Sequence, residues 1–510
     1  MAVYDYDLGI IGAGAAGIAA AKAAARVGGK TILIEKSEKS WGGCFHSGCI
    51  SSKTLIRSAQ VWSLARRAEE FGLPKLSLPP VSMAQLTARL RSVVDVVREK
   101  DSCECLRKLG ITVRFGEAKF VDKLQGSKEA GESDRKSDVK GKVGEARSIE
   151  NRSVVVGGET ITAEAWIIAT GSRAAVPALE GLEEVPYWTT DTIFSMERFP
   201  QRLLVLGGGP AGVELAQAFC RLGSQVSIIE IEQQLLPSED EDIADLLEKR
   251  LAAEGVDVCT GTTPLKVEGT DSMVRLTVSR TAGGAEPWTI EGDALLVAVG
   301  RAPNTEELDL DAMKVPFFPR GIPTYPSTRT GIRGIYACGD VNGLFPYAHI
   351  AEFEAEAAVS NVLLKISKRV DYSKIPWCTY TDPEIATIGY NEKKAKAGGV
   401  EYSLHTASFK EIDMAFVEGA PEGLIKVLTD SKGTVLGCQI IGCRAGELIH
   451  EWAAAVNGRA KIADMAGWVH VYPTLAGITK KVVDSIHSTR VNQGRSQKFM
   501  RFLLGLRGKR

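Results

Sequence analysis

Residues 8–17 read LGIIGAGAAG, and this stretch decides the fold of the first part of the chain. A strand-like apolar run leads into three glycines, and an alanine-rich stretch with helical character follows to about Val27. A second apolar run, residues 31–34, ends on Glu35. The order strand, G-x-G-x-x-G, helix, strand and acidic residue predicts a dinucleotide-binding βαβ unit.

Each marked position of this unit has a physical role in holding a dinucleotide. Gly12 permits the tight turn, Gly14 lets a pyrophosphate approach the backbone, and Gly17 lets the helix pack closely on the strand. Glu35 is placed to hydrogen-bond a ribose hydroxyl. We therefore expect a dinucleotide on this loop.

The same pattern occurs a second time. An apolar run at residues 203–206 leads into Gly207, Gly209 and Gly212, and a later apolar run ends on Glu230. The spacing from residue 12 to residue 35 and from residue 207 to residue 230 is 23 residues in both units. Two matches at one spacing predict two dinucleotide sites.

The second acidic residue also indicates which nucleotide binds. A carboxylate at Glu230 accepts a hydrogen bond from a free 2′-hydroxyl and repels a 2′-phosphate. Residues 231–234 contain no lysine or arginine that would reverse this preference. We expect the second site to prefer NAD(H) over NADP(H).

Between the two units, residues 41–53 read WGGCFHSGCISSK and contain Cys44 and Cys49. Five residues of regular helix rise about 7.5 Å, so a disulfide here needs a distorted turn, which Gly42 and Gly43 permit. Helical spacing begins near residue 50, and a thiol at a helix N-terminus is favoured as thiolate. The alternative is a pair of small residues packed in a glycine-rich turn.

Composition excludes several classes of function. The 510 residues carry a net charge of −1, which gives no electrostatic basis for binding nucleic acid. No run of eighteen apolar residues indicates a membrane span, and the start of the sequence has no room for a signal peptide, so we expect a cytoplasmic protein. Ten cysteines in so long a chain do not indicate a disulfide scaffold, and a close pair in a reducing compartment is more typical of catalysis.

The remaining segments complete the organisation. Residues 55–115 have helical character, and residues 123–151 are so polar that they predict a disordered insertion between two strands of a small hairpin sheet. An apolar strand ends on the small-residue turn at 169–172, and another ends on Asp340, from which a carboxylate can reach a flavin's ribityl hydroxyls. Beyond about residue 375 the pattern changes to strands and a helix.

Together, these motifs resemble the class I pyridine nucleotide-disulfide oxidoreductases, which include dihydrolipoamide dehydrogenase, glutathione reductase and mercuric reductase. The resemblance implies an α/β homodimer with two Rossmann-like domains, for FAD and NAD, and a C-terminal α+β dimerisation domain. The implied bounds are 1–186 with 305–374 for the FAD domain, 187–304 for the NAD(P) domain and 375–494 for the dimerisation domain. Residues 495–510 remain as a basic and apolar tail, expected to pack on its own domain rather than on a membrane surface.

The resemblance also implies roles for individual residues, with electrons passing from NADH through FAD to a Cys44–Cys49 disulfide. Cys49 matches the thiol beside the flavin, and Cys44 matches the interchange thiol that attacks substrate. Lys53 matches the lysine near the flavin N5, and Glu214 matches the glutamate paired with it. The implied FAD contacts are Gly12, Gly14, Ala15, Ala16, Gly17, Glu35, Lys36, Gly42, Gly43, Lys53, Ala118, Thr170, Gly171, Ser172, Asp340 and Ala348. The implied NAD contacts are Gly207, Gly209, Gly212, Glu214, Glu230, Val267, Gly300 and Arg301.

The C-terminal segment departs from the pattern of the disulfide-reducing members. They carry His-Pro-Thr-x-x-Glu, whose His–Glu dyad serves the partner subunit's interchange thiol, whereas Tyr472 and Gly477 stand at those two positions here. A phenol with an ordinary pKa near 10 is a poor base for a thiol at neutral pH. Mercuric reductases have a tyrosine there, and thiolate pairs suit soft cations. The sequence shows neither the N-terminal metal-binding domain nor the C-terminal cysteine pair of mercuric reductases.

Three functions therefore stay open. The first is an NADH-dependent reductase of a disulfide or of a thiol-bound metal, similar to mercuric reductase, with no structural metal and with Cys44 and Cys49 as contacts for a substrate metal. The second is a dihydrolipoamide dehydrogenase that uses His470 as base, because residues 470 and 472 would share a face if they lay on a strand. The third is a flavoprotein of low turnover that acts as a redox-sensing or binding module.

Overall fold

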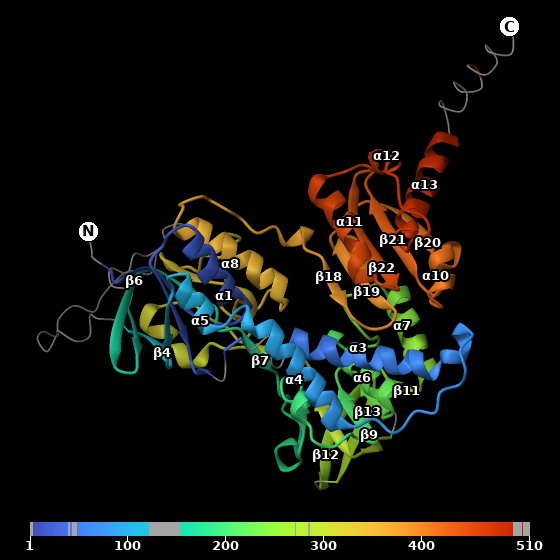
Figure 1. Cartoon of the computed structure of the whole chain (residues 1–510), viewed down its shortest axis with the longest axis horizontal. Coiled ribbons are helices and arrows are strands. Elements are labelled where there is room, and N and C mark those ends of the chain that lie inside the picture. Colours follow the sequence, from blue (N-terminus) through green and yellow to red (C-terminus); the bar gives the residue numbers. More distant parts are fainter. Residues whose placement is uncertain are drawn as a thin grey trace, which may run out of the picture.

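The computed structural model describes residues 4–38, 41–42, 48–121, 153–270, 272–283, 286–492 and 502. It shows an α/β fold of three parts, which confirms the predicted fold class. The parts meet around helix α3 (Cys49–Arg66), which crosses the middle of the molecule (Figure 1). The predicted insertion at 123–151 and the tail at 495–510, apart from residue 502, lie outside the described residues.

The first part is built on a seven-stranded sheet with the order β3-β2-β1-β6-β5-β4, and β17 also pairs with β6. Strands β1, β2, β3, β6 and β17 are parallel, so their carboxyl ends meet at one edge, where ligands bind in such sheets. The strands are β1 (Tyr6–Ile11), β2 (Thr31–Glu35), β3 (Thr112–Phe115), β4 (Ala118–Val121), β5 (Ser153–Val156), β6 (Glu159–Ile168) and β17 (Ile335–Ala337).

Helices cover this sheet and connect it to the rest of the molecule. Helix α1 (Ala15–Arg26) packs against α8 (Ala348–Val362) through small alanine side chains (Figure 1). The expectation of helices throughout 55–115 is correct for α3, α4 (Met83–Glu99) and α5 (Cys103–Lys108), but wrong for β3. Those four residues extend because their backbone pairs with β2, a contact that local spacing does not reveal.

The second part repeats the arrangement. Its parallel sheet has the order β11-β10-β9-β15-β8, and a three-stranded antiparallel sheet, β12-β13-β14, lies beside it. The elements are β8 (Trp188–Thr189), β9 (Arg202–Leu206), α6 (Pro210–Leu222), β10 (Gln225–Ile229), α7 (Glu241–Glu254), β11 (Val256–Cys259), β12 (Thr262–Thr270), β13 (Met273–Arg280), β14 (Trp288–Gly292) and β15 (Ala294–Val297). A two-stranded ribbon, β7 (Ser172–Ala174) with β16 (Arg301–Pro303), links the two parts.

The third part is an antiparallel sheet with the order β18-β19-β22-β21-β20, covered by helices that bury Trp452 and Ile478. Its elements are β18 (Trp377–Thr379), β19 (Glu384–Gly389), α9 (Glu392–Ala397), β20 (Ser403–Ser408), α10 (Asp413–Val417), β21 (Leu424–Thr429), β22 (Val435–Gly442), α11 (Ala445–Gly458), α12 (Ile462–Met465) and α13 (Gly477–Asn492). Within the described part of the chain, no helix is both long and apolar enough to cross a membrane.

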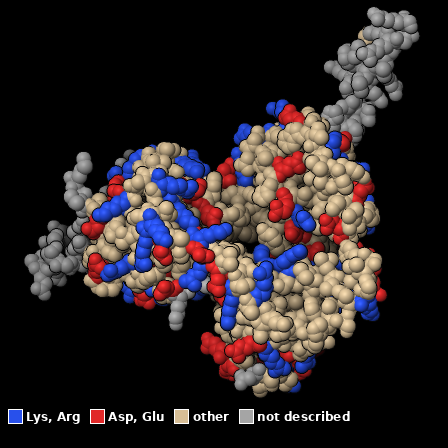
Figure 2. Space-filling view, in the orientation of Figure 1, with Lys and Arg blue, Asp and Glu red and all other residues tan. Residues whose placement is uncertain are grey.

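Charged residues of both signs are interspersed over the visible face of the molecule (Figure 2). This distribution agrees with the net charge of −1 and gives no broad single-sign patch on that face.

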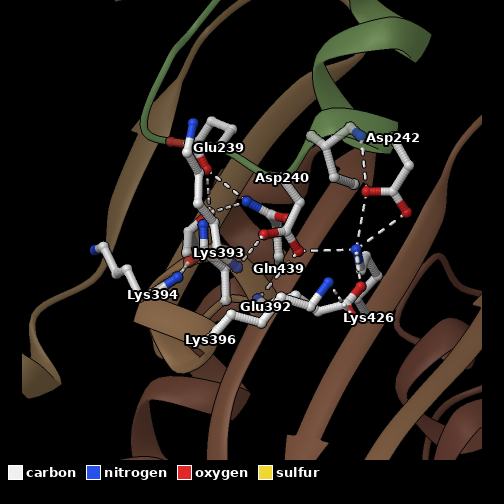
Figure 3. A network of polar contacts seen from close by, with 12 residues as sticks. Glu239, Asp240, Asp242, Glu392, Lys393, Lys394, Lys396, Lys426 and Gln439 are labelled. Atoms are coloured by element: carbon white, nitrogen blue, oxygen red, sulfur yellow. Dashed lines mark hydrogen bonds and ion pairs between the residues drawn. The ribbon is translucent and has the colours of Figure 1, made fainter. Parts of the chain in front are cut away.

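The second and third parts are joined by a buried ionic cluster (Figure 3). The Lys426 ammonium on β21 lies 2.8 Å from Asp240 Oδ2, 2.8 Å from Asp242 Oδ1 and 2.7 Å from Glu392 Oε2. Burial lowers the pKa of Lys426, but hydrogen bonds to the three carboxylates outweigh it and hold the pKa above its ordinary value. Because Lys426 is 1% exposed, its charge is tolerated only while these partners remain.

We predict that Lys426→Met destabilises the protein strongly, because it leaves the buried Asp240 carboxylate without the ammonium that it faces. Removing one partner of a buried ion pair costs about 3–5 kcal/mol. Lys396→Met is the control, since Lys396 is exposed and reaches Glu392 only at 3.5 Å, and such a surface pair contributes little to stability. Thermal unfolding should show a much lower midpoint for the first variant only; equal midpoints would contradict this account.

Candidate functional site

A cavity of about 870 Å³ lies at the carboxyl edge of the first sheet. Its wall includes Cys49 and Arg301, which come from elements outside that sheet. Most of the residues expected to contact FAD line it: Gly12, Gly14, Ala15, Ala16, Glu35, Lys36, Ala118, Thr170, Gly171, Ser172, Asp340 and Ala348. The structure thus gathers residues from positions 12 to 348 around one cavity.

The first glycine loop is shaped by steric limits on a Cβ atom. Gly12 has φ +102°, and a Cβ there would lie 2.3 Å from the Ala169 carbonyl oxygen. A Cβ on Gly17 would lie 1.8 Å from the carbonyl oxygen of Gly12. Helix α1 can therefore pack this closely on the glycine turn only because residue 17 has no side chain. A Cβ on Gly14 would meet nothing within 4 Å, and Gly14 lines the cavity. This leaves an open cradle of backbone N–H groups at the start of α1.

The second loop repeats these limits. Gly207 has φ +106°, and a Cβ there would lie 2.5 Å from the Ala298 oxygen. A Cβ on Gly212 would lie 2.0 Å from the Gly207 oxygen, while one on Gly209 would meet nothing within 4 Å. The two loops are therefore equivalent in geometry, one at the start of α1 and one at the start of α6.

Each loop is held by the acidic residue that ends the following strand. Glu35 accepts hydrogen bonds from the Ala13 N–H at 2.6 Å and the Lys36 N–H at 2.8 Å. Glu230 accepts them from the Gly208 N–H at 2.5 Å and the Glu232 N–H at 2.8 Å. Both carboxylates are more than nine-tenths buried, so each is oriented beside its glycine loop.

The far side of the cavity is formed by the turn that follows β17. The Ser172 hydroxyl donates to Asp340 Oδ2, and Arg301 donates to Ser172 Oγ at 2.6 Å. The turn is held from behind by the buried Glu354, which accepts from the Gly339 N–H at 2.6 Å and from Tyr372 Oη at 2.6 Å. Sequence reasoning missed Glu354; the only signal was an acidic residue among the alanines of α8.

Two residues assigned to the second nucleotide lie elsewhere. Arg301 is turned toward the first cavity, where it also donates to Asp191 Oδ1 at 3.0 Å, because β16 pairs with β7 rather than with the second sheet. Val267 is 1% exposed, and its side chain packs in an apolar core of the second part. The structure therefore does not bring either side chain to the second glycine loop.

The cysteine segment is attached to the first cavity. The buried Gly42 donates its N–H to the Ala13 oxygen at 3.1 Å, so the segment starts beside the first glycine loop. Cys49 is the first residue of α3, is exposed and lines the cavity. A thiol at that helix end is favoured as thiolate. Cys44 and Gly43 lie outside the described residues.

One turn along α3, Lys53 forms an ion pair with Glu214 of α6. The ammonium lies 2.7 Å from Glu214 Oε2, and the two side chains are 34% and 6% exposed. The structure therefore brings together the two residues that the resemblance paired. It adds Tyr380, which the sequence did not suggest: its N–H donates to Glu214 Oε1 at 2.8 Å.

Comparison with known proteins agrees with this geometry. The family described as pyridine nucleotide-disulphide oxidoreductase matches residues 6–355, and the dimerisation domain of that family matches residues 375–483. The chain belongs to the pyridine nucleotide-disulphide oxidoreductase family. The resemblance is confirmed, and the protein is an enzyme of the FAD-dependent class that uses NAD(P)H.

The relatives of this oxidoreductase are named for different activities. Mercuric reductase of Staphylococcus aureus is 30% identical over 474 residues, 92% of this chain and 81% of that protein. Dihydrolipoyl dehydrogenase 3 of Haloarcula marismortui is 34% identical over 480 residues, 92% of this chain and 94% of that protein. LpdA from Mycobacterium tuberculosis has a TM-score of 0.81 at 25% identity, covering 94% of this chain and 99% of its own. The flavoprotein disulfide reductase RclA from Escherichia coli shares the fold, with a TM-score of 0.78 at 24% identity. That match covers 94% of this chain and 99% of RclA.

The C-terminal segment of this oxidoreductase separates His470 from Tyr472. His470 Nε2 lies 2.9 Å from Glu451 Oε1, and its side chain is 12% exposed. Tyr472 is 78% exposed, and its hydroxyl donates to Asp413 Oδ2 at 2.9 Å, which raises the pKa of the phenol. Residues 468–472 form no strand, so the expectation that His470 and Tyr472 share a strand face is wrong.

The equivalent loops of this oxidoreductase allow a matched pair of variants. Gly14→Ala and Gly209→Ala each place a methyl group in open space, so neither change should prevent the protein from folding. We predict that Gly14→Ala lowers the flavin content of the purified protein at least tenfold, because the pyrophosphate can no longer approach the backbone. Gly209→Ala should retain flavin and bind NADH at least tenfold more weakly. A Gly14→Ala protein with stoichiometric flavin would contradict the assignment of the first cavity.

Proposed function

We propose that the protein is an NADH-dependent flavoprotein reductase, similar to the mercuric reductases among its relatives, that passes electrons through a Cys44–Cys49 disulfide to a disulfide or a thiol-bound soft metal. The observation that carries the proposal is the place of Cys49, at the start of α3 and in the wall of the cavity with the first glycine loop and Asp340. The cavity fits FAD: its volume is about 870 Å³, its backbone is open at Gly14, and its carboxylate at Asp340 can accept from ribityl hydroxyls.

The residues of the chain have distinct tasks in this proposal. A bound flavin supplies the two-electron link between NADH and the disulfide. The N-terminus of α3 favours the Cys49 thiolate, and the Lys53 ammonium adds positive charge one turn further along the helix. Reduction of the disulfide by two electrons and two protons yields two thiols. Exchange with a substrate disulfide restores the bridge and releases two substrate thiols.

We propose that the protein works as a homodimer. The C-terminal part matches a dimerisation domain and exposes large apolar side chains around Tyr472: Val469 is 96% exposed and Val471 is 78% exposed. Clustered exposed apolar residues support a protein interface. In such a dimer Tyr472 would face the cysteine segment of the other subunit and help hold a soft cation between thiolates.

We also propose that NADH is preferred over NADPH. The buried Glu230 carboxylate stands beside the second glycine loop, where a 2′-phosphate would bring further negative charge. Residues 231–234 offer no cation to offset it.

A second candidate function is dihydrolipoamide dehydrogenase. The observation in its favour is the His470–Glu451 pair at 2.9 Å, because a carboxylate holds an imidazole in one orientation. Within the described chain, His470 Nδ1 has no hydrogen-bond partner. This function requires His470, and not Tyr472, to serve the interchange thiol.

NADH oxidation by the flavin-loaded protein, with lipoamide and with thiol-complexed Hg(II), separates the two functions. We predict that Hg(II) accelerates turnover, that Cys44→Ser abolishes this acceleration, and that His470→Ala retains most of it. Tyr472→Phe should lower the Hg(II) rate, since it removes the hydroxyl and keeps the ring.

The opposite pattern would overturn the first proposal. Rapid lipoamide turnover that His470→Ala abolishes would assign the enzyme as a dihydrolipoamide dehydrogenase. If NADH reduces the flavin and neither acceptor accelerates turnover, the protein is a redox module of low turnover and both reductase proposals fail.

A further inference from the structure

Tyr380 belongs to the C-terminal part, in the loop between β18 and β19, yet it contacts both members of the Lys53–Glu214 pair. Its backbone N–H donates to Glu214 Oε1 at 2.8 Å. The centre of its ring lies 4.6 Å from the Lys53 Nζ, within the range of a cation–π contact. The other oxygen of Glu214 lies 2.7 Å from the same ammonium. Tyr380 therefore contacts both the Glu214 carboxylate and the Lys53 ammonium, which also contact each other.

The ammonium needs more than one contact to keep a single position. A lysine side chain is a point charge on a flexible four-carbon stem, and one partly exposed ion pair restricts it weakly. The face of a neutral aromatic ring attracts the cation without competing for the carboxylate. Burial raises the pKa of Tyr380 to about 12, so the ring stays neutral at physiological pH.

The loop that carries the ring is itself held in place by α6. The Gln217 side chain donates to the backbone carbonyl oxygen of Asp382 at 2.8 Å and accepts from the backbone N–H of Asp382 at 2.8 Å. Arg221, one turn further along the same face of α6, donates to Asp382 Oδ2 at 2.8 Å. The helix that carries Glu214 thus also fixes the distance between Glu214 and Tyr380.

The strands on both sides of the loop are anchored to the second part as well. Glu239, 2% exposed, accepts from Trp377 Nε1 at 2.8 Å, from the Thr387 hydroxyl at 2.9 Å and from Gln439 Nε2 at 2.5 Å. Figure 3 shows Glu239 beside the Lys426 cluster. The ring of Tyr380 is therefore presented to Lys53 from a rigid support.

We propose that Tyr380 is a positioning residue: its ring holds the Lys53 ammonium in place, so that docking of the C-terminal part sets the charge beside the bound flavin. This inference rests on the proposed function in placing Lys53 beside the flavin. A fixed cation there stabilises the reduced flavin, which carries more negative charge than the oxidised form.

The test compares Tyr380→Phe and Tyr380→Leu in the full-length, flavin-loaded protein by measuring the midpoint potential of the flavin. Tyr380→Phe keeps the ring. The equilibrium constant between oxidised and reduced flavin should therefore stay within twofold of the wild-type value. Leucine removes the ring, and we expect about a tenfold shift against reduced flavin, which corresponds to about 30 mV for a two-electron couple. Tyr402→Leu is the control, because Tyr402 lies in the same domain and its hydroxyl donates to Glu392. This variant should leave the midpoint potential of the flavin unchanged.

A double-mutant cycle separates positioning from packing. If the ring acts through Lys53, adding Tyr380→Leu to Lys53→Met should shift the potential no further than Lys53→Met alone. A lower thermal midpoint with an unchanged potential would reduce Tyr380 to a structural role and overturn the proposal. A Phe variant that behaves like the Leu variant would also overturn it. The potential is measured without any acceptor, so failure of the proposed substrate leaves this test intact.

Discussion

The Lys53–Glu214 ion pair is the interaction at which all three parts of the structure meet. Glu214 is nearly buried, and a carboxylate stripped of its partner in such a place costs about 3–5 kcal/mol. Its two oxygens are satisfied by groups from different parts, the Lys53 ammonium of α3 and the Tyr380 N–H of the C-terminal loop. A single carboxylate on α6 therefore ties the cysteine-bearing helix to both of the other parts.

The nucleotide loops impose a second constraint, which is local. In both units the first glycine needs a positive φ and the third glycine allows the backbone to approach itself within a distance that excludes a Cβ. In both units the acidic residue then locks the loop through backbone N–H groups. The chain therefore contains two equivalent nucleotide loops, and the position of α3 places Cys49 in the wall of the cavity at the first loop.

Contacts between neighbours along the chain can be predicted from the sequence, whereas contacts between distant residues cannot. This difference limits how much of the fold and of the site the sequence predicts. The glycine loops, Glu35, Glu230 and the start of α3 near Cys49 depend on neighbours along the chain, so the sequence alone predicts them. Lys53 and Glu214 stand 161 residues apart and were paired only through a family resemblance. Tyr380, Glu354 and the direction of Arg301 depend on how separate parts dock, so spacing could not reveal them. The strand expected around His470 is absent, because residues 468–472 pair with no strand in the part of the chain that the structure describes.

We propose that Cys44 and Cys49 form a redox-active disulfide coupled to the flavin of the same subunit. Anaerobic reductive titration of the flavin-loaded protein tests it most directly. A coupled flavin and disulfide should take up four electrons per subunit in the wild type and two in Cys49→Ser, since each group accepts two. A wild-type protein that is fully reduced by two electrons would contradict the account.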